Sequence, residues 1–142
     1  MKKKLMLIIN PAAGRGGYKQ GFTEALKILN DGGYRTTLFY TDGARDATEY
    51  AGRYAHDFDA VACIGGDGTL SEVIAGLMRV PSPPPLGYIP MGTANDVATT
   101  LGLPKNDTIG AALRLVRGSA HPYDVGGFGA DDVVVGLEGP ED

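Results

Sequence analysis

The chain has 142 residues, of which 43% are hydrophobic and 21% are charged, and its formal net charge at pH 7 is -4. This composition indicates one ordinary globular domain with a core, excludes a disordered chain, and disfavours nucleic acid as the main partner. No apolar run approaches the length of a transmembrane helix. The single cysteine, Cys63, excludes a disulfide within the chain and is expected to be a small buried residue of a strand.

Apolar runs and apolar residues at helical spacing alternate along the chain. In chain order they predict a strand at 5–10, a helix over 22–29, a strand at 36–40, a helix over 47–54, a strand at 60–64, a helix over 69–77, a strand at 86–90 and a helix over 109–116. This alternation predicts a doubly wound α/β fold, with a mostly parallel sheet and helices on both of its faces. Ligands of such sheets bind at the carboxyl ends of the strands, so the loops that follow the strands are the candidate site.

The loop after the first expected strand reads NPAAGRGG, at 10–17. It matches neither the Walker A pattern nor G-x-G-x-x-G. Asn10 could hydrogen-bond backbone or a ribose, and Arg15 and Lys19 could neutralise phosphate charge, but an ordinary glycine loop that enters a helix is an equal alternative. In the next loop Thr41 could bind a nucleotide, whereas Asp42 and the glycine after it form an ordinary turn signal.

The loop after the third expected strand reads GGDGT, at 65–69. Asp-Gly is also a hairpin signal, but the helical spacing that follows favours a turn from a strand into a helix. Thr69 and Glu72 match a capping box, so the helix is expected to begin at Thr69. Glycines before a helix N-terminus favour an anion, and Asp67 beside phosphates requires a cation such as Mg²⁺. We therefore expect Asp67→Ala to weaken Mg-nucleotide binding without unfolding the domain.

The fourth loop reads PMGTAND, at 90–96, and Thr93 and Asp96 form a cap-like pair before an apolar run. The tail at 126–142 is rich in glycine and acidic residues. Its apolar run at 133–137 could add one strand to the sheet, but the tail is too short for a second domain. The two histidines, His56 and His121, are expected to be surface or structural residues rather than catalytic bases.

Taken together, the loops resemble the diacylglycerol kinase catalytic domain family, which includes bacterial lipid kinases and sphingosine kinases. The resemblance covers about residues 5–125, and it depends on the order and spacing of three motifs: Asn10-Pro11 with Gly14, Gly65-Gly66-Asp67-Gly68-Thr69 with Glu72, and Gly92-Thr93-Ala94-Asn95-Asp96. GGDGT alone is shared with NAD kinases and 6-phosphofructokinases, and the resemblance implies a fold similar to theirs. Ser71 stands where the family commonly has Asn.

The resemblance implies roles for individual residues. ATP binding is implied for Asn10, Pro11, Ala12, Ala13, Gly14, Thr41, Gly66, Asp67, Gly68, Thr69, Leu70, Ser71, Glu72 and Thr93. Asp67 is implied to serve the Mg-nucleotide, directly or through water, and Asn95, Asp96 and Asp124 to form a polar network near the site.

The implied function is transfer of the γ-phosphate of Mg-ATP to a lipid hydroxyl of the diacylglycerol type. Residues 1–125 would form the nucleotide-binding kinase domain, and the β-rich C-terminal domain of the family, which carries the acidic residue that activates the lipid, is expected to be absent from 126–142. The chain alone is therefore expected to bind nucleotide and to turn over poorly. An NAD kinase-like enzyme and a non-enzymatic nucleotide-binding module remain alternatives. The expected location is the cytoplasm, with visits to the inner membrane surface for lipid, and a homodimer is compatible with this interpretation.

Overall fold

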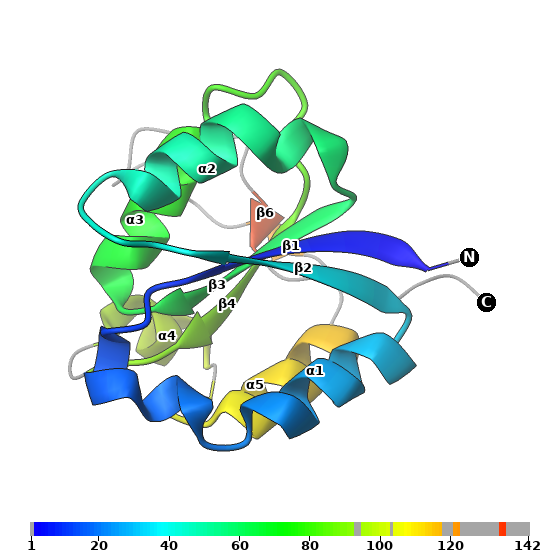
Figure 1. Cartoon of the computed structure of the whole chain (residues 1–142), viewed down its shortest axis with the longest axis vertical. Coiled ribbons are helices and arrows are strands. Elements are labelled where there is room, and N and C mark those ends of the chain that lie inside the picture. The colour runs from blue at the N-terminus through cyan, green and yellow to red at the C-terminus, as the bar shows by residue number, and fades with distance from the viewer. Residues whose placement is uncertain (1, 93–94, 103, 118–120, 123–133, 136–142) are drawn as a thin grey trace.

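A single sheet forms the centre of the computed structural model, which describes residues 2–92, 95–102, 104–117, 121–122 and 134–135 (Figure 1). The strand order is β2-β1-β3-β4-β6-β5. All pairings are parallel except that of β5 with β6. The strands are β1 (Lys3–Ile9), β2 (Tyr34–Tyr40), β3 (Ala60–Gly65), β4 (Leu86–Pro90), β5 (His121–Pro122) and β6 (Val134–Val135).

Helices cover both faces of this sheet. In Figure 1, α2 and α3 lie above it and α1 and α5 below it, while α4 follows β4 at the carboxyl edge. The doubly wound, mostly parallel fold is therefore confirmed. The helices are α1 (Phe22–Asp31), α2 (Asp46–Tyr54), α3 (Asp67–Leu77), α4 (Asp96–Leu101) and α5 (Thr108–Arg117), with short 3₁₀ helices η1 (Ala13–Lys19) and η2 (Ala55–Asp57).

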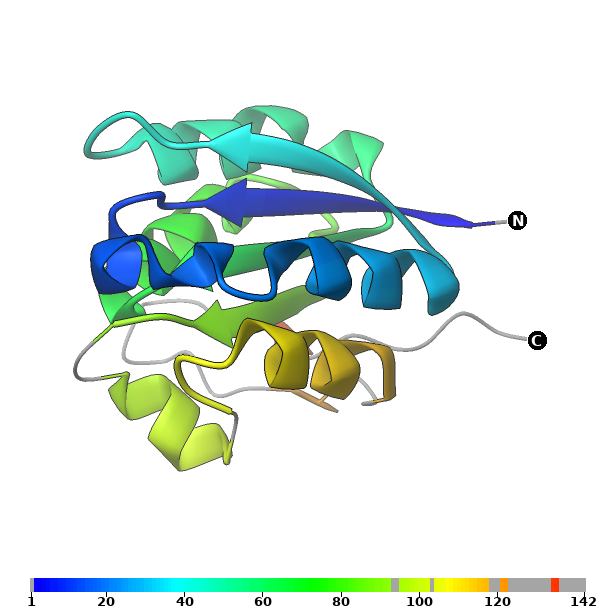
Figure 2. The ribbon, with the colours of Figure 1, turned by 60° about the horizontal axis from the view of Figure 1, so that its bottom comes forward.

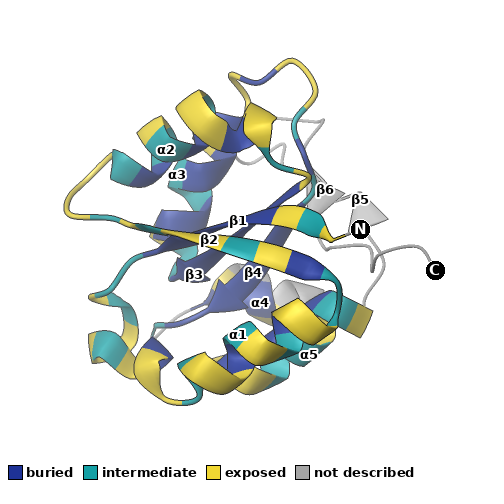
Figure 3. Ribbon diagram, turned by 45° about the vertical axis from the view of Figure 1, so that its right-hand side comes forward, coloured by how far each residue is buried: buried dark blue, intermediate teal, exposed yellow. Residues whose placement is uncertain are grey.

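The core consists of two apolar layers, one on each face of the sheet. The central strands β1, β3 and β4 are almost entirely buried, which Figure 3 shows in dark blue. A strand buried on both faces reads as a continuous apolar run, and this is why the sequence located these strands well. Cys63 is fully buried in the layer under α2 and α3, as expected, and burial raises the pKa of its thiol.

The capping box predicted at Thr69 is wrong, because α3 begins at Asp67 and its N-cap residue is Gly66. Both side chains of the supposed box bind other loops. The hydroxyl oxygen of Thr69 accepts a hydrogen bond from Asn10 Nδ2 at 3.3 Å. A carboxylate oxygen of Glu72 accepts one from the backbone N–H of Arg45 at 2.6 Å. Thr69 and Glu72 therefore bind other loops at the carboxyl edge of the sheet, and the T-x-x-E pattern does not mark a local cap.

The cap-like pair at the fourth loop is not found either. Helix α4 begins at Asp96 with Asn95 as its N-cap residue, and no side-chain bond caps it. Thr93 lies outside the described residues. The strand expected within 133–137 is present as β6, which pairs with Leu86 of β4.

None of the helices in the described part of the chain is long and apolar enough to cross a bilayer.

Candidate functional site

The loops that follow β1, β2, β3 and β4 meet at the carboxyl edge of the sheet, on the left in Figure 2. Backbone hydrogen bonds continue the ladders just beyond the strand ends. The N–H of Asn10 donates to Ile64 O at 3.0 Å, that of Thr41 to Ile9 O at 2.9 Å, and that of Met91 to Gly65 O at 2.8 Å. Each loop therefore starts beside its neighbour, and residues far apart in the sequence come together.

Two adjoining hollows lie at this edge. The larger, with a volume of about 520 Å³, is lined by Asn10, Ala13, Gly14, Gly66, Asp67, Gly68, Thr69, Glu72, Met91, Gly92 and Asn95. The smaller, of about 340 Å³, is lined by Asn10, Pro11, Ala12, Thr41, Asp42, Gly43, Ala44, Thr69 and Glu72. Three residues line both hollows, so the two lie side by side, and together they are called the cleft.

The loop after β1 forms one wall of the cleft. Asn10 Oδ1 accepts a hydrogen bond from the N–H of Ala12 at 3.1 Å, which turns the chain into η1. Gly14 has φ 57°, and a Cβ added there would lie 2.7 Å from Cγ of Met91. Glycine is therefore favoured both by the left-handed backbone and by the close approach of the Met91 side chain.

The first turn of α3 forms the floor of the cleft. Gly66, Asp67, Gly68 and Thr69 all line it, and the first N–H groups of a helix have no acceptor within the helix. A Cβ added at Gly68 would meet nothing within 4 Å, so this residue faces open space. Unpaired N–H groups and the positive end of the helix dipole make this floor suited to an anion such as phosphate.

Asp67 joins the loop after β3 to the loop after β4. Its Oδ2 accepts a hydrogen bond from the backbone N–H of Asp96 at 2.6 Å, and its Oδ1 accepts one from the hydroxyl of Tyr88 at 3.1 Å. A carboxylate oxygen can accept a second hydrogen bond, so each retains capacity for water or a ligand. Asp67 is thus both a cleft residue and a structural link.

Sequence reasoning missed the polar groups that hold the loop after β4. Tyr88 reads as one more apolar residue of LGYIP, yet its hydroxyl also lies 3.5 Å from Oδ1 of buried Asn95. Asn106 accepts a hydrogen bond from the N–H of Gly92 at 2.9 Å and donates one to its carbonyl oxygen at 3.1 Å. No local pattern marks Asn106, because its partner lies 14 residues away.

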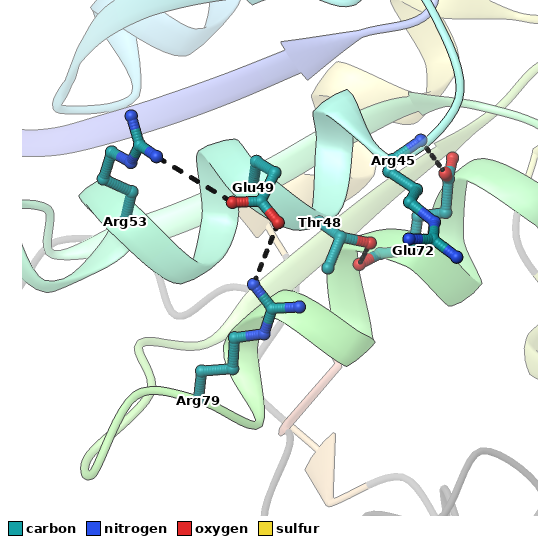
Figure 4. A network of polar contacts seen from close by, with 6 residues as sticks. All are labelled: Arg45, Thr48, Glu49, Arg53, Glu72 and Arg79. Carbon is teal, nitrogen blue, oxygen red and sulfur yellow. Dashed lines mark hydrogen bonds and ion pairs between the residues drawn. The ribbon is translucent and has the colours of Figure 1, made fainter.

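Glu72 belongs to a polar network between α2 and α3, which Figure 4 shows from close by. Besides the bond from Arg45 to its side chain, its carbonyl oxygen accepts a hydrogen bond from the hydroxyl of Thr48 at 2.8 Å. On the same side of α2, Glu49 pairs with Arg79 of the segment after α3 at 3.2 Å. The two helices are therefore fixed to each other, and Glu72 is held at the rim of the cleft.

Comparison with known proteins agrees with this geometry. The family model of the diacylglycerol kinase catalytic domain matches residues 4–128. The chain belongs to this diacylglycerol kinase family. A diacylglycerol kinase of Bacillus subtilis strain 168 is 40% identical over 125 residues, which are 87% of this chain and 41% of that protein. One of Staphylococcus aureus strain bovine RF122 / ET3-1 is 39% identical over 127 residues, or 89% of this chain and 40% of that protein.

The fold agrees as well. The crystal structure of a diacylglycerol kinase from Bacillus anthracis strain Sterne superimposes with a TM-score of 0.76 at 33% identity, and the match covers 84% of this chain and 41% of that one. This member of the diacylglycerol kinase family thus spans about two fifths of the length of the relatives that it matches.

Most residues that the sequence singled out lie at the cleft of this kinase-family chain. Nine of them line the larger hollow: Asn10, Ala13, Gly14, Gly66, Asp67, Gly68, Thr69, Glu72 and Asn95. Pro11, Ala12 and Thr41 line the smaller one. Leu70 is buried in the core, half-buried Ser71 lines neither hollow, and Asp96 reaches the site through its backbone N–H. Thr93 and Asp124 lie outside the described residues.

Acidic ligands for a metal ion are few in the described ranges. The described ranges contain no group of three or more His, Cys, Asp or Glu side chains that could hold a metal ion. Asp67 and Glu72 are the carboxylates that line the larger hollow. His56 is exposed in η2, where its Nε2 lies 3.3 Å from Asp57, and it is remote from the lining of both hollows.

Proposed function

We propose that this chain is the nucleotide-binding part of an ATP-dependent lipid kinase, which transfers the γ-phosphate of Mg-ATP to a hydroxyl of a diacylglycerol-like lipid. The observation that carries the proposal is the cleft at the carboxyl edge, whose floor is the glycine-flanked N-terminus of α3. Phosphoryl transfer depends mostly on positioning and on neutralising charge, and this floor supplies fixed N–H donors for both.

The two hollows suggest how the nucleotide would be divided between them. Gly66, Gly68 and Thr69 would hold the phosphates through backbone N–H groups. Thr41 and Glu72 line the smaller hollow and would contact the ribose or the base. Asn10, Thr69 and Glu72 line both hollows, so they are suited to the junction of sugar and phosphate.

The donor groups fit a magnesium ion held through water. Mg²⁺ usually keeps several waters and binds one or two carboxylates together with the phosphates of the substrate. Asp67 offers one carboxylate whose two oxygens already accept hydrogen bonds from the protein, so contact through an ordered water suits it better than a direct bond. Magnesium would supply charge neutralisation on the phosphates.

The acceptor half of the reaction needs a general base near the lipid hydroxyl. In the larger hollow the acids are Asp67 and Glu72, and both are engaged with backbone or side-chain donors, while Asp42 lines the smaller hollow. We therefore propose that residues 1–125 form the nucleotide-binding domain and that the base belongs to the β-rich domain of the family, outside this chain. The chain alone would bind nucleotide and phosphorylate lipid poorly.

The proposal extends to location and assembly. An enzyme of the cytoplasm that visits the inner membrane surface suits a substrate that is dissolved in the bilayer. A homodimer would most readily use β2, because it is an edge strand of the sheet and exposes Leu38 and Tyr40. Light scattering on the purified chain would test the dimer, and a monomer at all concentrations would exclude it.

Calorimetry with ATP, with and without Mg²⁺, tests the nucleotide site on this chain. We expect binding that magnesium strengthens, and no binding would overturn the proposal. The acceptor is tested on the protein that contains this domain together with its lipid-binding part. Transfer to diacylglycerol rather than to NAD supports a lipid kinase, transfer to NAD supports an NAD kinase-like enzyme, and nucleotide binding with neither transfer supports a non-enzymatic module.

A further inference from the structure

The hydroxyl of Tyr88 is a polar group inside the apolar layer that packs under α2 and α3. Tyr88 is 1% exposed, and in the register of the sheet it pairs with Cys63 at the middle of β3. A buried hydroxyl without a partner is costly, so the site must supply an acceptor. Here the acceptor is the Asp67 carboxylate at 3.1 Å, reached from beneath the first turn of α3.

We propose that Tyr88 is a positioning residue that fixes the Asp67 carboxylate in the orientation in which it serves the Mg-nucleotide. This inference rests on the nucleotide site proposed above. The N–H of Asp96 holds one carboxylate oxygen at 2.6 Å and the Tyr88 hydroxyl holds the other. One hydrogen bond leaves the carboxylate free to swing about that contact, whereas two set the plane of the group.

The chemistry of the phenol suits a donor rather than a base. Burial, reinforced by the neighbouring Cys63 and by the charge of Asp67, raises the pKa of Tyr88 far above its ordinary value. The hydroxyl therefore keeps its proton at neutral pH. It donates to Asp67 and takes no part in proton transfer.

The same hydroxyl lies beside a polar chain that holds the loop after β4. Asn95, 2% exposed, places its Oδ1 3.5 Å from the Tyr88 hydroxyl and donates from Nδ2 to Gly92 O at 3.0 Å. Gly92 is in turn held on both of its backbone groups by Asn106. The single proton of the hydroxyl goes to Asp67, so its loss would loosen Asp67 and leave the contacts among Asn95, Gly92 and Asn106 in place.

The test is Tyr88→Phe, which removes the hydroxyl and keeps the ring. Calorimetry on the chain compares ATP with Mg²⁺ and ATP with a chelator. A hydrogen bond to a charged group is worth about a tenfold change in an equilibrium constant. We expect Tyr88→Phe to weaken Mg-ATP binding about tenfold and to change binding of metal-free ATP less than about twofold.

The matched control is Tyr34→Phe. Tyr34 is also 1% exposed but lies in the other core layer, at the start of the edge strand β2. Loss of a buried hydroxyl there lowers stability without reaching the cleft, so nucleotide affinity should not change with or without magnesium. An equal loss of affinity in both variants would show a general effect of stability and would overturn the proposal.

A double-mutant cycle with Asp67→Asn tests whether Tyr88 acts through Asp67. In that background Tyr88→Phe should change Mg-ATP affinity less than about twofold, because the group that it positions has lost its charge. A full tenfold loss in both backgrounds would overturn the inference. If Tyr88→Phe does not fold, nuclear magnetic resonance of the tyrosine ring carbons replaces it: Mg-ATP must shift the Tyr88 Cζ signal of the unsubstituted chain, and an unmoved signal overturns the inference.

The two proposals fail in different ways. If the unsubstituted chain binds ATP equally with and without Mg²⁺, the magnesium role of Asp67 fails and the role of Tyr88 fails with it. If magnesium strengthens binding and Tyr88→Phe behaves as the unsubstituted chain does, the inference about Tyr88 alone is overturned.

Discussion

Asp67 combines a structural role with the ligand role that we propose for it, and two substitutions separate the two. Asp67→Asn keeps the shape of the side chain and removes its charge. Its oxygen can accept from the N–H of Asp96, and its amide can donate to the Tyr88 oxygen, whose proton then turns to Asn95 at 3.5 Å. Only the charge assistance of two hydrogen bonds is lost, so we expect a cost of about 1–2 kcal/mol in the free energy of unfolding.

Asp67→Ala removes both acceptors. The N–H of Asp96 is at the surface, where water replaces the carboxylate at a cost of about 1 kcal/mol. The buried Tyr88 hydroxyl is left with the long contact to Asn95, which costs about 1–3 kcal/mol more. The total, about 2–4 kcal/mol, is smaller than the stability of most domains, about 5–15 kcal/mol, so both variants should fold.

Urea unfolding and calorimetry with ATP, each with and without Mg²⁺, decide the matter. We expect both variants to lose the strengthening by magnesium, and Asp67→Ala to be less stable than Asp67→Asn by about 1.5 kcal/mol, the difference between the midpoints of the two ranges. Mg-ATP binding by Asp67→Asn at the affinity of the unsubstituted chain would refute the magnesium role. Equal stability of the two variants would refute the hydrogen-bond reasoning.

Three further predictions concern two glycines and the buried thiol and phenol groups of Cys63 and Tyr88. Gly68→Ala should keep or raise urea stability, because its Cβ meets open space in a helix, yet calorimetry should show weaker Mg-ATP binding; unchanged affinity would contradict the floor assignment. Gly76→Ala should lower the free energy of unfolding in urea by about 1–3 kcal/mol, because the added Cβ would collide with Thr48 O and lie 2.7 Å from a side chain of α2. An unchanged free energy of unfolding would contradict this packing. Burial raises the pKa values of Cys63 and Tyr88, so as the pH rises these groups lose their protons in the unfolded chain before they do so in the folded one. The free energy of unfolding, measured by urea titration at a series of pH values, should therefore fall above about pH 8.5. Substituting both residues by apolar ones should flatten that fall.

The sequence predicted the strands and the site edge, and the reason is physical. Strands β1, β3 and β4 are covered on both faces, so their residues form apolar runs that are hard to mistake. The glycines of the loop after β3 mark a close turn into a helix, and that turn is present. These signals are local, and each depends on residues a few positions apart.

The errors and omissions come from contacts between distant segments. Glu72 looks like a local cap but binds Arg45, which is 27 residues earlier. Tyr88 looks like core, and nothing in LGYIP indicates that its hydroxyl reaches a carboxylate 21 residues earlier. A single sequence carries no direct signal for such pairs. The polar links of a site built from several loops were therefore the part that could not be predicted.

The fixed pairing of α2 with α3 has a consequence for motion. The hydrogen bond from Thr48 to Glu72 and the close backbone approach at Gly76 hold the two helices together. We therefore expect the helices to move as one rigid body. Any adjustment of the cleft to a ligand is then expected in the opposite wall, where Gly14 of η1 lies against Met91 and α4 follows β4. Closure would then move that wall toward the wall formed by α2 and α3, and the latter includes the N-terminal amides of α3.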